Sequence, residues 1–160
     1  MKMQKTRPWK TYLFWIVLSE GVGLTAGLLS MQATKLYQQT AVKPPFSPPG
    51  FLFPIVWGVL YLLMGIGAAM ADLSPKSGER TRTLRLFALQ LAFSFAWPLF
   101  FFNLKAYAFA FFWLLALWAL ILLFTLSLKK LNKTGAVLQI PYLVWVAFAA
   151  YLNAGVWFLN

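Results

Sequence analysis

The sequence contains neither cysteine nor histidine. Disulfides, thiolate nucleophiles, thiolate or imidazole metal sites and every histidine-based catalytic triad are therefore excluded. Axial ligation of haem by cysteine or histidine is excluded for the same reason. We accordingly predict no metal site.

Charged residues are also scarce. They make up 11% of the 160 residues, and hydrophobic residues make up 61%, whereas ordinary soluble domains have about 25% charged and 45–50% apolar residues. A soluble domain of this length buries only about 70% of the surface that its unfolded chain exposes. The remaining surface could not be covered by so few polar groups, so the composition predicts an integral membrane protein.

Five apolar segments run along the chain, each close to the roughly 20 residues that a membrane-spanning helix needs. They cover residues 12–29, 51–71, 86–102, 107–128 and 137–158. We predict an all-α integral membrane protein in which residues 1–160 form a single bundle of five transmembrane helices. The longest connections are then Ser30–Gly50 and Asp72–Arg85. Prolines 54, 98 and 141 fall inside these segments and are interpreted as kinks, because neighbouring helices can satisfy the freed carbonyls.

Basic residues are distributed unevenly among the connections. Eleven of the 14 lysines and arginines precede the first segment or lie in the second and fourth connections: Lys2, Lys5, Arg7, Lys10, Lys76, Arg80, Arg82, Arg85, Lys129, Lys130 and Lys133. The positive-inside rule then predicts a cytoplasmic N-terminus and an external C-terminus at Asn160. Topology and attraction to anionic lipid account for the net charge of +11, so no nucleic-acid partner is expected.

The first connection is rich in proline and aromatic residues. Four prolines lie between Pro44 and Pro49, and they favour a stiff, extended segment. One interpretation is a rigid connector that leads into the second helix. The other is a lid over the mouth of the bundle, which would exclude water from an apolar ligand.

Three helix faces combine aromatic, small and uncharged polar side chains at helical spacing. They are Trp57 and Tyr61 in the second segment, Gln90, Ser94 and Trp97 in the third, and Trp145, Ala149 and Asn153 in the last. Polar groups at membrane depth usually face the bundle interior. These groups are few and uncharged, which favours recognition of a large apolar ligand over ion conduction. For Trp57 and Trp145, an interfacial aromatic belt is the alternative to a pocket role.

The first segment carries two further features. Glu20 is the only carboxylate predicted at membrane depth, and it is either functional or a protonated or hydrogen-bonded acid close to Thr25 or an interhelical amide. Gly23 and Gly27 form a G-x-x-x-G motif, which permits close helix contact either within the bundle or in a dimer.

Three groups of residues resemble the TspO/MBR family, the tryptophan-rich sensory proteins related to the mitochondrial translocator protein, or peripheral benzodiazepine receptor. The first group is Lys43-Pro44, Pro48-Pro49, Phe53-Pro54, Val56-Trp57, Leu60-Tyr61 and Met64-Gly65; the second is Gln90-Leu91-Ala92, Trp97 and Phe101-Phe102; the third is Pro141-Tyr142-Leu143, Trp145, Ala147-Phe148-Ala149, Leu152-Asn153 and Trp157. The resemblance extends over nearly the whole chain from Gly21 onward.

The resemblance implies a five-helix receptor or sensor with a regulatory role, often homodimeric, in a bacterial cell membrane. Such proteins bind porphyrins, and some bind sterols or benzodiazepine-type compounds, between the helices and under the first loop. We expect protoporphyrin IX or another tetrapyrrole as the ligand, with no required cofactor. The expected ligand-binding residues are Pro44, Phe46, Phe51, Pro54, Trp57, Tyr61, Gln90, Ser94, Trp97, Tyr142, Trp145, Phe148, Ala149 and Asn153.

Two alternative functions stay open. Some similar bacterial proteins promote light-dependent breakdown of protoporphyrin, and Trp57 and Trp145 would then be the photochemically active, catalytic residues. The other alternative is transport of such ligands, although the chain has neither internal repeats nor a charged path through the membrane.

The chain departs from the family pattern at several positions. Phenylalanine replaces tryptophan at two loop positions, serine replaces a third-helix asparagine, and tryptophan occupies the position of a common fourth-helix acid; these residues are Phe46, Phe51, Ser94 and Trp113. Ala154 and Phe158 stand where the sterol motif of the animal proteins needs tyrosine and arginine. This difference argues against sterol binding through that motif.

Overall fold

The computed structural model describes residues 7–160, and every regular element in this range is helical. The elements are α1 (Pro8–Thr40), α2 (Leu52–Asp72), α3 (Gly78–Pro98), the π-helix η1 (Leu99–Asn103), α4 (Tyr107–Leu131), α5 (Lys133–Val137) and α6 (Ile140–Leu159). Five stretches are long and apolar enough to cross a membrane when η1 is joined to α3 and α5 to α6. The five-span, all-α prediction is therefore confirmed. Lys2 and Lys5, which contribute to the predicted orientation, lie outside the described residues.

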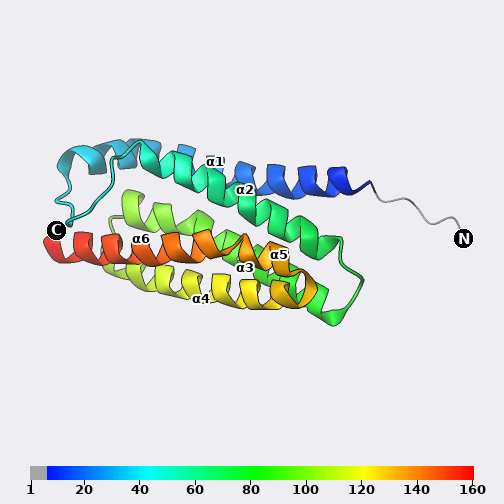
Figure 1. Cartoon of the computed structure of the whole chain (residues 1–160). Helices are drawn as coiled ribbons and strands as arrows, with labels where there is room; N and C mark the ends of the chain where they lie inside the picture. The colour runs from blue at the N-terminus through cyan, green and yellow to red at the C-terminus, as the bar shows by residue number, and fades with distance from the viewer. Residues whose placement is uncertain (1–6) are drawn as a thin grey trace, which may run out of the picture.

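The long helices run side by side, and α1 and α2 form one side of the bundle (Figure 1). The start of α1 and the end of α6 lie at opposite ends of the bundle (Figure 1). We call the end where α2 ends and α3 begins the basic end, because Arg80, Arg82, Arg85 and Lys130 lie there. The opposite end, formed by residues 41–51 and the end of α6, is the loop end.

Helix α4 supplies the densest part of the core. Its fully buried side chains alternate at spacings of three and four residues, which places them along one stripe of the helix. They are Leu114, Leu117, Ile121, Phe124 and Leu128. Helix α1 instead exposes many large apolar side chains, including Leu13, Phe14, Leu24 and Leu28. Lipid is an acceptable solvent for those side chains, so the exposure pattern agrees with a membrane environment.

Two connections are shorter than predicted. Helix α1 continues to Thr40, so Ser30–Thr40 is helical and the predicted loop Ser30–Gly50 is reduced to residues 41–51. The segment has no glycine or proline. Seven of its 11 residues are good helix formers, namely three glutamines and one methionine, alanine, lysine and leucine each, although the segment is too polar for a span. Helix α3 likewise begins at Gly78, because the Ser77 hydroxyl caps it by accepting a bond from the Arg80 amide at 3.1 Å.

Pro54 and Pro141 are not the mid-helix kinks that the sequence predicted. Pro54 and Pro141 lie in the first turns of α2 and α6, where a missing amide proton leaves no intrahelical bond unmade. A two-residue break separates α5 from α6 just before Pro141. Pro98 ends α3, and the backbone continues as the π-helix η1.

Close contact between α1 and α2 depends on glycine. A Cβ atom at Gly65 would lie 2.6 Å from the Ile16 Cα, so the two backbones touch there. A Cβ atom at Gly23 would collide with the ring of Tyr61, whereas one at Gly27 would meet no atom within 4 Å. Gly23 therefore packs within the bundle, and Gly27 faces outward.

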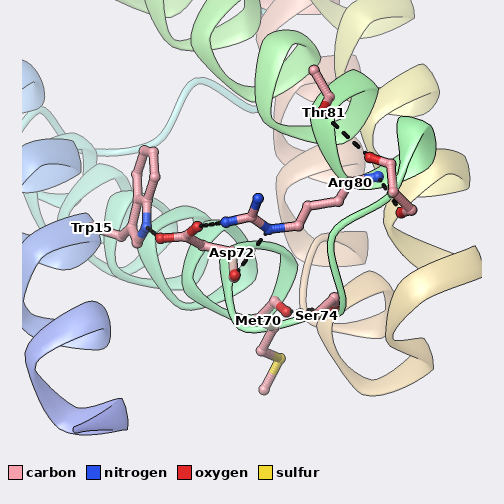
Figure 2. A network of polar contacts seen from close by, with 7 residues as sticks. Trp15, Met70, Asp72, Ser74, Arg80 and Thr81 are labelled. Atoms are coloured by element: carbon pink, nitrogen blue, oxygen red, sulfur yellow. Dashed lines mark hydrogen bonds and ion pairs between the residues drawn. The ribbon is translucent and has the colours of Figure 1, made fainter. Parts of the chain in front are cut away.

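Polar contacts tie the helices together at the basic end. The Trp15 indole N–H donates to Asp72 Oδ2 at 2.9 Å, and the Arg80 guanidinium forms an ion pair with the other carboxylate oxygen, so one side chain joins α1, α2 and α3 (Figure 2). Between α3 and α4, the Ser127 hydroxyl donates to Glu79, and Lys130 lies 3.4 Å from the same carboxylate. Two of the three acidic residues of the chain are used in this way.

Candidate ligand-binding site

Aromatic rings from α2 and α6 meet in the half of the bundle nearer the loop end. The ring centroids of Trp57 and Tyr142 are 6.2 Å apart, and those of Phe53 and Trp145 are 5.8 Å apart. Phe53 and Trp57 are four residues apart on α2, and Phe148 extends the row on α6 by packing 5.6 Å from Trp145. We call the surface between these rings the aromatic seam.

A buried polar layer lies behind the aromatic seam. The hydroxyls of Tyr61 and Ser94 are 2.9 Å apart, and the Tyr142 hydroxyl donates to Gln90 Oε1 at 3.0 Å. All four residues are buried, and each hydroxyl and the Gln90 carbonyl has a partner. Trp57 packs 5.8 Å from Tyr61, which connects this layer to the rings.

The indole nitrogen of Trp145 differs from these groups. It is buried and has no hydrogen-bond partner among residues 7–160. An indole N–H can only donate, and a buried donor without an acceptor is unfavourable by about 1–3 kcal/mol. The aromatic seam thus contains one donor directed at no protein acceptor.

The last-helix residues predicted to share one face diverge in the structure. Trp145 contacts α2, whereas the Asn153 side chain accepts a bond from Trp97 Nε1 at 3.1 Å and donates to the Tyr107 carbonyl at 2.8 Å. Trp145 and Asn153 are eight residues apart, and at about 100° per residue this separation places them about 80° apart around the helix axis. Asn153 therefore joins α3, α4 and α6 instead of lining the aromatic seam, and Ala149 is buried between the two positions.

Residues 41–51 form a loop that is docked on α6. The backbone of Val42 exchanges two hydrogen bonds with the Asn160 side chain, at 3.1 and 2.8 Å. The Tyr151 hydroxyl donates to the Pro45 carbonyl at 2.8 Å, and Pro44 lies so close to Gly155 that a Cβ atom there would be 2.5 Å from it. These contacts hold the loop over the end of the bundle (Figure 1).

In addition to Trp97 and Asn153, three further predicted ligand residues lie away from the rings. Phe46 is 88% exposed and has a positive φ of 65°, and Phe51 is 70% exposed. Pro54 is also exposed. The structure brings together Trp57, Tyr61, Gln90, Ser94, Tyr142, Trp145 and Phe148. Pro44 lies in the loop itself and packs against Gly155 of α6.

The structure also shows the surroundings of Glu20 and Trp113, two other residues singled out in the sequence. Glu20 is half-buried on α1, and the Thr25 hydroxyl donates to the Gly21 carbonyl of its own helix rather than to Glu20. Trp113 stacks on Phe93 at 4.0 Å and donates to the Phe93 carbonyl. Trp113 therefore fixes α4 to α3, on a different surface from the aromatic seam.

Phe53, Tyr151 and Asn160 belong to the site and were not predicted. The spacing of Phe53 from Trp57 could have indicated a shared helix face. Tyr151 and Asn160 form hydrogen bonds with residues that are 106 and 118 positions away in the sequence, so no local pattern predicts their roles.

The chain matches the TspO/MBR family over residues 15–158. It belongs to this family. Its relatives include the tryptophan-rich protein TspO of Chlorobaculum tepidum, 33% identical over 94% of this chain and 96% of the relative. The translocator protein of Ovis aries is 37% identical over 72% of this chain and 69% of its own length.

A third relative, the tryptophan-rich sensory protein of Cereibacter sphaeroides, is 29% identical over 91% of this chain and 88% of the relative. Family membership and these names identify a TspO-type membrane sensor or translocator. The same membership supports an integral membrane location in association with the lipid bilayer.

Proposed function

We propose that this TspO/MBR protein is a membrane receptor for a tetrapyrrole such as protoporphyrin IX, bound at the aromatic seam. The observation that carries the proposal is the buried, unpartnered indole N–H of Trp145 among the rings of Phe53 and Phe148. A flat apolar ligand that bears a carbonyl or carboxylate would stack on the rings and accept this bond.

The chemistry of the aromatic seam fits such a ligand. A macrocycle held without histidine or cysteine depends on stacking and shape. Because the rings of Trp57 and Tyr142 already contact each other, the ligand enters by separating side chains of α2 and α6. Binding is therefore accompanied by a rearrangement of the aromatic seam.

The test is a dark titration of the detergent-solubilised protein with protoporphyrin IX, followed by the absorbance of the porphyrin. Trp145→Phe keeps a ring and removes the donor, so the affinity should fall by about tenfold or less, equivalent to ~1 kcal/mol. Trp145→Ala should weaken binding further. Trp157→Phe is the matched control, because Trp157 lies on the opposite part of α6 against Phe111 and Phe112.

Unchanged affinity in Trp145→Ala would contradict the proposed site. A sterol and a benzodiazepine-type compound in the same titration would show whether the site is selective for tetrapyrroles. Retained porphyrin binding with no response to any aromatic-seam variant would place the ligand elsewhere.

A second candidate function is light-dependent breakdown of the bound porphyrin. It is favoured by the arrangement of oxidisable rings, since Trp57 packs against both Tyr61 and Tyr142, and the hydroxyls of the two tyrosines are hydrogen-bonded to Ser94 and Gln90. Illumination of the bound complex, compared with a dark sample, tests this function. Transport would instead require net movement of the ligand between two compartments, measured in sealed vesicles.

Homodimer formation and orientation are parts of the same proposal. Gly27 offers an open face of α1 for contact with a second copy, so Gly27→Leu should lower the mass of the particle in detergent. An N-terminus in the cytoplasm follows from the excess of basic residues at the basic end. A C-terminal alkaline phosphatase fusion should then be active, and a C-terminal reporter that folds only in the cytoplasm should be dark.

A further inference from the structure

An open groove with a volume of about 430 Å³ runs along the outer face of α3 at the basic end. Its lining residues recur at spacings of three and four, so they form one stripe of the helix. They are Gly78, Thr81, Arg82, Arg85, Leu86 and Leu89. The stripe is cationic in its first two turns and apolar in the next.

Among residues 7–160, Arg82 has one long ion pair and Arg85 has none. Arg80, on the same part of α3, is paired with Asp72 and directed toward α1 and α2 (Figure 2). Arg82 reaches Glu79 only at 4.0 Å, and Glu79 is also held by Ser127 and Lys130. Arg85 has no ion pair among residues 7–160 and is exposed.

The apolar part of the groove coincides with the start of the predicted membrane segment. Leu86 is the first residue of the predicted apolar segment 86–102, and Leu89 is 47% exposed. Arginine side chains placed at such a boundary can direct their guanidinium groups to the headgroup region while their stems lie along apolar surface. Gly78, where a Cβ atom would meet nothing within 4 Å, leaves the polar end of the groove open.

We propose that this groove binds one anionic phospholipid, with its phosphate held by Arg82 and Arg85 and its acyl chains lying along Leu86 and Leu89. Guanidinium groups three residues apart on one helix face match the oxygens of a single phosphate, which arginine binds through two parallel N–H bonds. Charge complementarity and the adjoining apolar wall together favour a lipid over a free anion. The site is separate from the aromatic seam, which is nearer the opposite end of the bundle.

Native mass spectrometry of the whole chain in neutral detergent, doped with phosphatidylglycerol, measures the affinity for the first bound lipid. The Arg82→Gln/Arg85→Gln variant should bind about 30-fold more weakly, since each basic side chain near a headgroup contributes about 1 kcal/mol. The matched control is Lys129→Gln/Lys133→Gln, which removes the same charge from exposed positions on α4 and α5 at the same end. The control should bind like the original protein.

Equal loss in the two double variants would overturn the proposal, because it would show attraction to charge in general. Equal binding of phosphatidylcholine would overturn it as well. Glycerol phosphate, which has the headgroup chemistry without acyl chains, should not displace the bound lipid. Efficient displacement by glycerol phosphate would show that the groove is a site for free phosphate compounds and not for a lipid. Both arginines are exposed, so thermal unfolding of the variants should match the original protein and report that they are folded.

Discussion

The two ends of the bundle are held together by different forces. At the basic end, Asp72 and Glu79 each join two or three helices through ion pairs and charge-assisted hydrogen bonds. At the loop end, the contacts are ring against ring and amide against backbone, and the aromatic seam contains no charge. Each ring contact contributes only about 0.5–1.5 kcal/mol beyond area burial and can form in more than one geometry, whereas loss of one ionic partner leaves an unpaired charge. The basic end is therefore suited to hold the helices in register, and the loop end to part around a ligand.

The largest effect is expected from breaking the basic end. Asp72→Ala removes the acceptor of the Trp15 N–H and the counter-charge of Arg80, so we expect about 3 kcal/mol of destabilisation. Unfolding in a detergent titration, followed by circular dichroism, measures it. Lys76→Ala, an exposed change in the same connection, is the control. Equal stability of the two variants would mean that the basic end is not held by Asp72.

A smaller effect should follow from overpacking the contact between α1 and α2. Gly23→Ala drives a methyl group into the buried ring of Tyr61, and a displacement of this ring also strains its bond to Ser94. We expect about 2 kcal/mol of destabilisation, typical of one extra methyl group in a packed core. Gly27→Ala is the matched control on the same helix, because its methyl group meets open space. If Gly27→Ala were as unstable as Gly23→Ala, contacts of α1 with a second molecule, and not the collision with Tyr61, would determine the loss of stability.

Freeing the docked loop should have a smaller effect on stability still. Asn160→Ala removes the two bonds to Val42, and we expect a loss of about 1 kcal/mol because both backbone groups can then bond to water. Porphyrin association in stopped-flow mixing should become faster if the loop restricts access. Phe158→Ala, at an exposed neighbouring position, serves as the comparison. Identical association rates would mean that the ligand does not pass the loop.

The smallest effect is expected on porphyrin affinity, when a tryptophan of the aromatic seam is replaced by phenylalanine. Trp57→Phe keeps the packing against Tyr61 and Tyr142, so the porphyrin affinity should stay within about tenfold, ~1.4 kcal/mol. Phenylalanine is harder to oxidise than tryptophan, so light-dependent loss of the porphyrin should fall much further. Trp145→Phe should behave in the same way. Unaltered photobreakdown in both variants would leave a binding protein without photochemistry.

The sequence was sufficient to predict the five spans, because each apolar run is set by the thickness of a bilayer. The helix ends were harder to predict. Ser30–Thr40 is polar, and its helical structure depends on helix propensity and on the packing of Tyr37 against Phe101 and Phe102. Trp57, Tyr61 and Tyr142 could be assigned to one region from spacing and family resemblance. The offset between Trp145 and Asn153 follows from spacing, because two four-residue steps rotate by about 80° around a helix. Which neighbouring helix each of these side chains meets could not be predicted, because it depends on how the bundle is assembled.

The orientation of buried donors is also beyond sequence patterns. Trp97 and Trp145 both occur in a predicted polar face. The Trp97 indole N–H donates to the Asn153 side chain, whereas that of Trp145 has no acceptor among residues 7–160. The difference depends on which helices meet at each position. A pattern along one helix contains no information about the neighbour that will supply an acceptor.

The length of α1 sets the height of the loop above the bilayer. Its 33 residues span about 50 Å at 1.5 Å per residue, whereas the hydrocarbon layer is about 30 Å thick. Much of the extra helix length lies in the segment that ends at Thr40. Tyr37 in this segment packs against Phe101 and Phe102 of η1. A thicker bilayer would draw more of this segment into lipid, and a thinner one would increase the tilt of the helix. Because α1 leads directly into the loop, we expect a change in bilayer thickness to change the position of the loop relative to the membrane surface.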